Sequence, residues 1–264
     1  MTSGVTSDPV IKLSWLTKRF GRTLAVDNLS LQVPRGSTFG LIGPNGAGKS
    51  TVFSMIGGFQ PPTDGKIIFK GRDITGVPAH DVAKLGIARV FQQSLIFGKL
   101  SVTENVLIGC HKEYRTSQWR RVLHTPGARR ESKAVREKAL AIIEFMGLGH
   151  VRHEQARSLP HGFQRALSVA VALATGPELL LLDEPVTGMN TTESKHMTDL
   201  IKKIRDLGIT VILVEHDMKV VMGVCERVVV INFGEKLCEG TAEHVQSHPD
   251  VCEAYLGKGT FDAA

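Results

Sequence analysis

One run of nine residues, 43–51, constrains this chain more than any other part of it. The run reads Gly-Pro-Asn-Gly-Ala-Gly-Lys-Ser-Thr and satisfies the pattern G-x-x-x-x-G-K-[ST]. The apolar residues 37–42 before it are expected to form a buried strand, and residues 49–56 after it a helix. Glycines let the backbone approach phosphate oxygens, so that N–H groups and the helix N-terminus face an anion. The run therefore predicts a phosphate loop that binds a nucleoside triphosphate.

Every residue of the loop is a candidate nucleotide contact. We expect the side chain of Lys49 to reach the β- and γ-phosphates, and the hydroxyl of Ser50 to ligate Mg²⁺. The predicted nucleotide-binding residues of the loop are Gly43, Pro44, Asn45, Gly46, Ala47, Gly48, Lys49, Ser50 and Thr51.

Two carboxylates follow a second apolar run. Residues 179–184 read Leu-Leu-Leu-Leu-Asp-Glu, a pattern typical of a buried strand with acidic residues at its carboxyl end. Side chains at such a strand end emerge beside the phosphate loop in phosphate-loop folds. We expect Asp183 to hold Mg²⁺, through water, and Glu184 to orient or deprotonate the attacking water. The alternative, a buried strand that simply ends in polar residues, is disfavoured because the phosphate loop is present.

Composition is ordinary for a globular chain of 264 residues, with 42% hydrophobic and 22% charged residues. No apolar stretch approaches the roughly 18 residues expected of a membrane span. The first residues have neither a basic start nor an apolar core, so no secretory signal is expected. The four cysteines lack metal-ligand spacing, which indicates reduced thiols in the cytosol.

The net charge of +6 is concentrated in one segment. Residues 112–138 contain nine Lys or Arg against three Glu, which also gives +6. Such a segment can bind nucleic acid or anionic lipid, or can be a solvated helical surface. We favour the solvated surface and expect no nucleic-acid partner, because Tyr114 and Trp119 are the only aromatic residues in this segment, too few for regular interleaving with the charges for base stacking.

The order of apolar patterns predicts an α/β fold. The expected strands span residues 10–15, 25–33, 37–42, 66–69, 87–91, 179–182, 209–215, 227–233 and 236–239. The expected helices span residues 49–56, 78–86, 131–147, 162–175 and 190–207, the last with Asn190 and Glu193 as a capping box and with Leu207 on its buried face. The pattern indicates a phosphate-loop NTPase core with a parallel sheet, an N-terminal antiparallel β subdomain and a helical subdomain.

Together these features resemble the ATP-binding-cassette ATPases. The likeness implies a single nucleotide-binding domain over residues 9–257, with a helical signature subdomain at about 94–176 and a short tail at 258–264. It also implies that the nucleotide is ATP. By position, Phe20 matches the family's aromatic ring that stacks on adenine. Gln92 matches its sensor of Mg²⁺ and the γ-phosphate, and His216 its γ-phosphate histidine.

The family's signature, usually Leu-Ser-Gly-Gly-Gln, corresponds here to Leu159-Pro160-His161-Gly162-Phe163. In the family this element covers ATP held by the opposite subunit. We therefore expect contacts to that nucleotide from Leu159, Pro160, His161 and Gly162. Pro160 replaces the serine and offers neither a hydroxyl nor a backbone N–H, so the resemblance implies fewer donors to the partner's site than the usual signature provides.

Within the family, residues 183–190, 214–222 and 232–257 are similar to ATPase subunits of branched-chain amino-acid uptake systems, a branch that also handles amides and urea. The resemblance implies a peripheral subunit on the cytoplasmic face of the plasma membrane. Its implied partners are integral permease subunits, a second ATPase subunit and, indirectly, a solute-binding protein. We hypothesise that a permease helix docks near residues 92–97. The alternatives are a soluble ATPase that acts on nucleic acid or ribosomes, and a weakly active partner of a different ATPase subunit.

Overall fold

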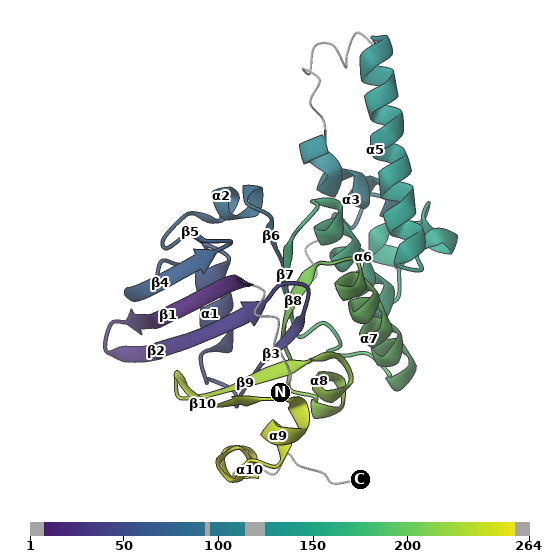
Figure 1. Cartoon of the computed structure of the whole chain (residues 1–264). Coiled ribbons are helices and arrows are strands. Elements are labelled where there is room, and N and C mark those ends of the chain that lie inside the picture. Colours follow the sequence, from purple (N-terminus) through teal and green to yellow (C-terminus); the bar gives the residue numbers. More distant parts are fainter. Residues whose placement is uncertain (1–7, 93–95, 114–124, 257–264) are drawn as a thin grey trace, which may run out of the picture. The chain divides into compact units, whose positions relative to one another are not determined.

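The computed structural model describes residues 8–92, 96–113 and 125–256 (Figure 1). The chain divides into two compact units. The first unit comprises Met1–Arg89, Glu178–Glu184 and Thr198–Ala264, and the second comprises Val90–Pro177 and Pro185–Met197.

The first unit opens with an antiparallel sheet in the order β2-β1-β4-β5. Its strands are β1 (Pro9–Phe20), β2 (Thr23–Pro34), β4 (Asp64–Phe69) and β5 (Arg72–Asp73). Gly21, with a φ of 58°, makes the turn between β1 and β2. The hairpin around Gly21 and the strand near residues 66–69 are confirmed. The two hairpin strands extend further than their apolar patterns indicated, since antiparallel pairing continues up to the turn.

A second sheet of six strands, in the order β10-β9-β3-β8-β7-β6, carries the parallel core. Its strands are β3 (Thr38–Ile42), β6 (Ile87–Val90), β7 (Leu179–Asp183), β8 (Thr210–Val214), β9 (Arg227–Asn232) and β10 (Glu235–Gly240). β8 pairs in parallel with both β3 and β7, and β3 pairs in parallel with β9. The segments after β3, β8 and β7 therefore leave the same edge of the sheet. The predicted α/β class is confirmed.

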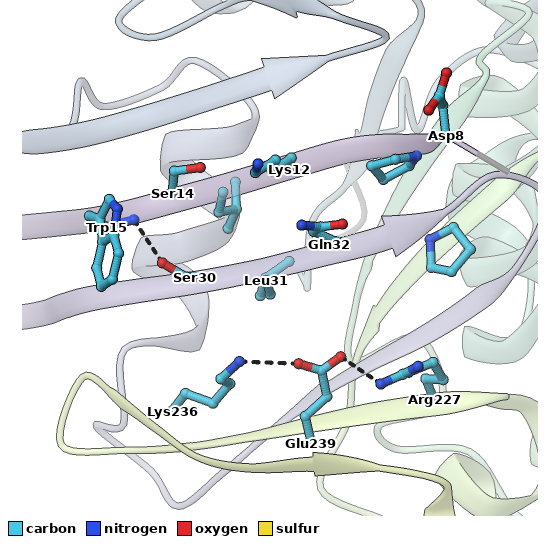
Figure 2. Close-up of a pocket in the computed structure, with 13 residues that line it drawn as sticks. Asp8, Lys12, Ser14, Trp15, Ser30, Leu31, Gln32, Arg227, Lys236 and Glu239 are labelled. Carbon is cyan, nitrogen blue, oxygen red and sulfur yellow. Dashed lines mark hydrogen bonds and ion pairs between the residues drawn. The ribbon is translucent and has the colours of Figure 1, made fainter. Parts of the chain in front are cut away.

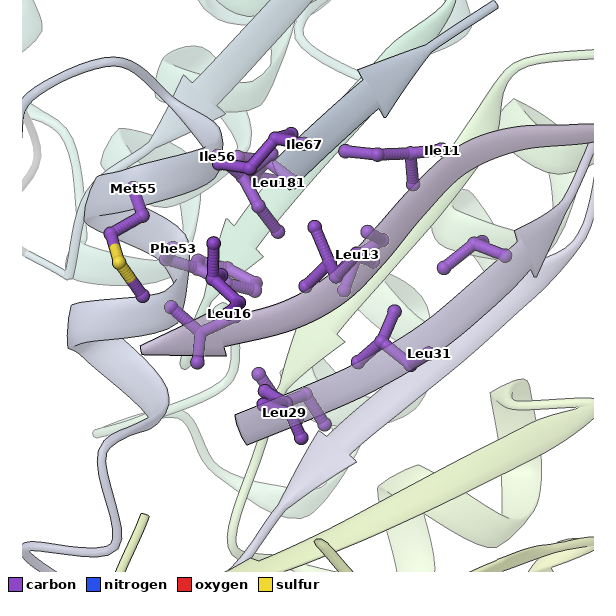
Figure 3. Packing of buried hydrophobic residues seen from close by; sticks show 14 of the residues in the cluster. Ile11, Leu13, Leu16, Leu29, Leu31, Phe53, Met55, Ile56, Ile67 and Leu181 are labelled. Carbon is purple, nitrogen blue, oxygen red and sulfur yellow. The ribbon is translucent and has the colours of Figure 1, made fainter. Parts of the chain in front are cut away.

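Helix α1 (Lys49–Ile56) follows the phosphate loop and covers a shared hydrophobic core. Figure 3 shows Phe53 and Ile56 of α1 near Leu13 and Leu16 of β1 and Leu181 of β7. Each of these side chains is at most 1% exposed. Because full burial of such a side chain contributes about 1.5–3 kcal/mol, this cluster fixes α1 against the strands.

Four further helices of the first unit are short. They are α2 (Ala79–Lys84), α8 (Met218–Val224), α9 (Ala242–Gln246) and α10 (Pro249–Leu256). Pro78 precedes α2 as its N-cap with an extended backbone, so its predicted place in the first turn is wrong. Proline is tolerated at this position as well, because the N–H that it lacks would have no acceptor within the helix.

The second unit is helical, with α3 (Val102–Gly109), α5 (Pro126–Phe145), α6 (His161–Ala174) and the start of α7 (Thr191–Asp206). α5 begins earlier than its apolar pattern because the side chain of Thr125 caps it and Pro126 occupies the first turn. It buries Val135, Ala139 and Ile143 and exposes Arg129 and Arg130. This described part of the basic segment is thus a solvated helix face, and residues 114–124 lie outside the description.

The start of α7 is capped as the sequence predicted. The backbone N–H of Glu193 donates to the Asn190 side chain at 3.0 Å, and the Glu193 carboxylate accepts from the Asn190 N–H at 3.0 Å. The predicted burial of Leu207 is wrong, since this residue is 64% exposed. The helix ends at Asp206, so Leu207 no longer follows the helical periodicity. Among the described residues, none of the helices is both long and apolar enough to cross a membrane.

Candidate functional site

The phosphate loop connects β3 to α1, and its shape requires glycine at two positions. Gly43 has a φ of 154°, and a Cβ there would lie 2.1 Å from the carbonyl oxygen of Ile231. Gly48 has a φ of 102° and caps α1, and a Cβ there would lie 2.4 Å from the Ala25 carbonyl oxygen. These contacts show that the loop is packed tightly against β2 and β9, in the conformation that lets main-chain N–H groups face an anion.

Lys49 is folded back onto the loop. Its Nζ donates to the carbonyl oxygens of Gly43 at 2.6 Å and Pro44 at 2.9 Å. The residue is only 8% exposed. Burial lowers the pKa of Lys49, and the nearby carboxylates of Glu184 and Asp183 oppose that shift. A cation thus lies within the loop, in electrostatic contact with both predicted carboxylates.

Glu184 adopts a backbone conformation that is rare for its residue type. Its φ is 48°, in the left-handed region, while its N–H donates to the Val214 carbonyl oxygen at 2.9 Å. Such strain persists only where the surrounding structure enforces it, and it is concentrated at functional sites. The turn directs the chain away from the sheet immediately after Asp183, at the edge that carries the phosphate loop.

Asp183, the last residue of β7, forms a buried ion pair that the sequence analysis missed. The Arg89 Nη2 lies 2.9 Å from its Oδ2, and the two side chains are 8% and 10% exposed. Arg89 belongs to β6, two strand residues after Ile87, and no local pattern distinguishes it from a solvent-exposed arginine. Only the position of β6 beside β7 in the sheet brings the two charges together.

His216 follows β8, which lies between β3 and β7. Its side chain is 60% exposed, whereas that of the preceding Glu215 is fully buried. The His216 N–H donates to Glu215 Oε2 at 3.1 Å, and Nδ1 lies 3.8 Å from the same oxygen. The exposed imidazole therefore emerges from the same sheet edge as the phosphate loop and the two carboxylates.

Phe20 ends β1 with 44% of its surface exposed, so it is not part of the core. The Lys18 ammonium lies 5.1 Å from the centre of its ring. An exposed ring of this kind has a face available for stacking on a planar ligand.

The signature stretch lies in the second unit, at the start of α6. Pro160 is the N-cap with an extended backbone, and no described side chain caps the helix. Pro160 and His161 are exposed, while Leu159 and Gly162 are buried. A Cβ at Gly162 would lie 2.9 Å from Glu193 Oε1, so the glycine lets α6 approach the start of α7. The α6 N-terminus consequently presents main-chain donors without a serine hydroxyl.

Gln92, also in the second unit, is held through its backbone by a residue that the sequence analysis did not identify. Arg165 of α6 donates through Nη1 to the carbonyl oxygens of Phe91, at 2.9 Å, and Gln92. Arg165 is 2% exposed. Arg165 thus links the backbone at Phe91 and Gln92 to α6, the helix that begins within the signature stretch.

A separate cavity of about 890 Å³ is lined by the outer side of β1 and β2 and by β9 and β10 (Figure 2). Glu239 lies within it and pairs with Arg227 at 3.0 Å and Lys236 at 3.2 Å. The Trp15 N–H donates to Ser30 Oγ at 2.8 Å on the same face. None of the residues that line this cavity belongs to the phosphate loop or to the carboxylate pair.

The donor set near the loop suits Mg²⁺ rather than a transition metal. Asp183 would supply a carboxylate oxygen and the exposed Ser50 a hydroxyl, both hard ligands. Among the described residues, no group of three or more His, Cys, Asp or Glu side chains forms a metal cluster. Mg²⁺ is characteristically held by one or two protein oxygens together with substrate phosphates, which matches this arrangement.

A family model described as "ABC transporter" matches residues 26–187, more than half of the chain. The chain belongs to the ABC transporter family. A second model, described as "Branched-chain amino acid ATP-binding cassette transporter", matches residues 235–260. The protein is thus an ATP-binding cassette, an ATPase coupled to transport, and a role as a soluble ATPase without a transporter is not supported.

Curated relatives extend over nearly the whole chain. This chain is 40% identical to two high-affinity branched-chain amino acid transport ATP-binding proteins, LivG of Escherichia coli (strain K12) and BraF of Pseudomonas aeruginosa. Both alignments cover 96% of this chain and 99% of the relative. The lipopolysaccharide export system ATP-binding protein LptB of Haemophilus influenzae is 34% identical over 92% of this chain and 95% of LptB.

Solved cassettes share the fold. A crystal structure of an ATP-binding cassette of an ABC transporter in its ADP conformation has a TM-score of 0.83 and 29% identity, covering 96% of this chain and 100% of the other. A cassette described as a dimeric post-hydrolysis state bound to ADP and Pi has a TM-score of 0.74 and 26% identity, covering 88% and 98%.

Proposed function

We propose that this chain is the ATPase subunit that powers uptake of branched-chain amino acids through a membrane importer. The observation that carries the solute class is the C-terminal match over residues 235–260, outside the part common to ABC transporters. The higher identity to LivG and BraF than to the export protein LptB, 40% against 34%, supports the same assignment.

In this proposal, each residue of the loop and the sheet edge has one task. Main-chain N–H groups of the loop hold the phosphates of ATP, and Lys49 exchanges its two carbonyl contacts for phosphate oxygens. Glu184 orients or deprotonates the attacking water, and His216 donates to the γ-phosphate. Mg²⁺, when bound by Ser50, Asp183 and Gln92, offsets negative charge on the phosphates. Phe20 stacks on the adenine.

The second unit contributes to the ATP site of a partner ATPase subunit. Leu159, Pro160, His161 and Gly162 bring the α6 N-terminus to ATP held by another ATPase subunit. Because Pro160 lacks a hydroxyl and an N–H, this chain completes that site with fewer donors than the usual signature. This loss favours, as a second candidate, a heterodimer in which a different ATPase subunit carries the stronger signature.

The location follows from the transporter assignment. The chain binds permease subunits at the cytoplasmic face of the plasma membrane, and a solute-binding protein acts on the other side. Phe97, 58% exposed, supports a permease contact near residues 92–97. Leu95, which belongs to the same hypothesis, lies outside the described residues.

Uptake of radiolabelled leucine, isoleucine and valine tests this function. A strain without the gene should lose high-affinity uptake of all three, and the wild-type gene should restore it. Lys49→Ala should fail to restore uptake, whereas Lys203→Ala, at an exposed lysine of α7, should restore it. Normal uptake of the three amino acids in the deletion strain, with loss of urea or amide uptake, would overturn the proposed solute class.

A further inference from the structure

Arg89 connects Asp183 and Ser50, two of the three residues that we assign to Mg²⁺. Its Nη2 lies 2.9 Å from Asp183 Oδ2, and its Nη1 donates to Ser54 Oγ at 3.1 Å. Ser54 lies one turn after Ser50 in α1, and its hydroxyl donates to the Ser50 carbonyl oxygen at 2.7 Å. A continuous chain of hydrogen bonds therefore runs from the Asp183 carboxylate at the end of β7 to the residue that carries the second oxygen ligand.

The guanidinium is held in place by more than these bonds. Its central carbon lies 5.8 Å from the Phe53 ring centre and 5.7 Å from that of Phe59. The Arg89 side chain is only 8% exposed. Cation–π contacts of a desolvated guanidinium and its planar set of donors both restrict its orientation. Arg89 is thus a rigid bridge rather than a mobile surface charge.

We propose that Arg89 is a positioning residue for the Mg²⁺ site. Its guanidinium donates a hydrogen bond to Oδ2 of Asp183, so the metal or its bound water contacts the other carboxylate oxygen, Oδ1. It also fixes α1, and with it Ser50, relative to β7. The inference rests on the roles of Ser50 and Asp183 in the proposed function. Residues that orient metal-binding carboxylates typically contribute about 10–100-fold in metal affinity.

The positive charge of Arg89, taken by itself, would weaken Mg²⁺ binding rather than strengthen it. A cation beside Asp183 repels Mg²⁺, so removing Arg89 entirely would mix a gain in attraction with a loss of orientation. Arg89→Lys keeps the charge, but a single ammonium cannot reproduce the fork that spans Asp183 and Ser54. Ser54→Ala breaks the same bridge from the other side and leaves the buried charge pair intact. The two variants therefore isolate positioning from charge.

The test measures binding of a fluorescent ATP analogue at increasing Mg²⁺, in a Glu184→Gln background that prevents hydrolysis. We expect Arg89→Lys to raise the Mg²⁺ concentration for half-maximal binding about tenfold, with unchanged affinity for the analogue in EDTA. Ser54→Ala should also raise the Mg²⁺ concentration for half-maximal binding. The double variant should shift it no further than Arg89→Lys alone, because both changes break one bridge. Arg205→Lys, which alters an arginine paired with Asp206 and Glu226, is the matched control.

An unchanged Mg²⁺ midpoint in folded Arg89→Lys and Ser54→Ala would overturn the proposal. An equal loss of affinity with Mg²⁺ and in EDTA would also overturn it, since that result indicates a general structural role. If Arg89→Lys does not fold, Ser54→Ala alone decides the matter. Failure of the parent protein to bind the analogue would instead count against the proposed ATPase function.

Discussion

At the scale of single residues, four charges define the centre of the first unit: Lys49, Arg89, Asp183 and Glu184. Three of them are largely buried, and the two carboxylates lie close enough to Lys49 to affect its pKa. Breaking a buried pair leaves an uncompensated charge, which costs about 3–5 kcal/mol. Variants that keep the charge or the shape of the side chain are therefore needed to separate function from stability.

Lys49→Ala should abolish tight binding of ATP. Hydrogen bonds to charged groups contribute about 1.5–3 kcal/mol, so the dissociation constant should rise about 10–150-fold. Titration with a fluorescent ATP analogue measures this change. Lys203→Ala should bind as the wild type does. Full retention of affinity in Lys49→Ala would refute the assignment of the loop.

Glu184→Gln should separate ATP binding from hydrolysis. Glutamine keeps the size of the side chain but cannot accept a proton, so phosphate release should fall about 10²–10⁴-fold. Affinity for ATP should be retained, because the loop contacts are unaffected. Glu193→Gln, an acidic-to-amide change in the cap of α7, should leave phosphate release near the wild-type rate. Normal turnover by Glu184→Gln would exclude this residue as the base.

At the scale of elements, the start of α7 shows how one residue sets a helix boundary. Asn190 and Glu193 exchange hydrogen bonds, and Gly162 of α6 lies against Glu193. Asn190→Ala should lower the free energy of unfolding by about 0.5–2 kcal/mol, since the cap is lost. Asn190→Asp should keep the cap and add about 0.3–1 kcal/mol from its charge at the helix N-terminus. Urea unfolding curves measure both, and equal stability of the two variants would contradict this account.

The β9–β10 turn supports the phosphate loop. The Gly234 N–H donates to the Ala47 carbonyl oxygen at 3.1 Å, and its own carbonyl accepts from Asp27 at 2.9 Å. A Cβ at Gly234 would lie 3.0 Å from the Ala25 carbonyl oxygen, while a Cβ at Gly21 meets nothing within 4 Å. Both glycines have positive φ, at 87° and 58°.

Gly234→Ala should therefore be more harmful than Gly21→Ala. Both variants carry the left-handed strain of about 1–2 kcal/mol, but only Gly234→Ala also displaces the segment that holds the loop. We expect Gly234→Ala to weaken ATP binding in titrations, and Gly21→Ala to lower the unfolding temperature alone. Equal ATP affinity in the two variants would show that the turn does not support the loop.

Elements with a strong local signal were predictable from the sequence. The loop glycines placed α1 at the observed residues, and the unbroken leucines of residues 179–182 placed β7. The short helices α3, α8 and α9 were missed, although Ser101, Asp217 and Thr241 cap them and were visible as capping residues. Arg89 and Arg165 could not be predicted, because their partners lie 94 and 73–74 residues away and only the fold brings them into contact.

At the scale of the whole molecule, the proposed ATP contacts divide between the two units. The phosphate loop, Asp183, Glu184 and His216 belong to the first, whereas Gln92 and the start of α6 belong to the second. A ligand stabilises the structure that binds it by RT ln(1 + [L]/Kd). ATP held by one chain should therefore protect the first unit from opening more strongly than the second.

Two buried cysteines report on this difference. Cys225 belongs to the first unit and Cys110 to the second, at 8% and 0% exposed. Burial, and then the charges of Glu215 and Glu226, raise the pKa of Cys225 to about 12, and burial raises the pKa of Cys110. Only the thiolate is alkylated, so at pH 8 each cysteine should react with iodoacetamide only after its surroundings open.

With Mg²⁺ and ATP at 100 times Kd, alkylation of Cys225 in Glu184→Gln should slow about 100-fold, since the ligand contributes about 2.7 kcal/mol. Cys110 should slow less, and in Lys49→Ala at the same ATP concentration the slowing of Cys225 should fall to about 2–11-fold, because this variant binds ATP about 10–150-fold more weakly. Mass spectrometry of the two peptides over time measures both rates.

The pH dependence of labelling is a second readout. Opened chains have an ordinary cysteine pKa near 8.5, so the labelling rate should level off above about pH 9. A rate that keeps rising towards pH 12 would mean that Cys225 reacts in the folded state, and equal protection of both cysteines would mean that the two units open together.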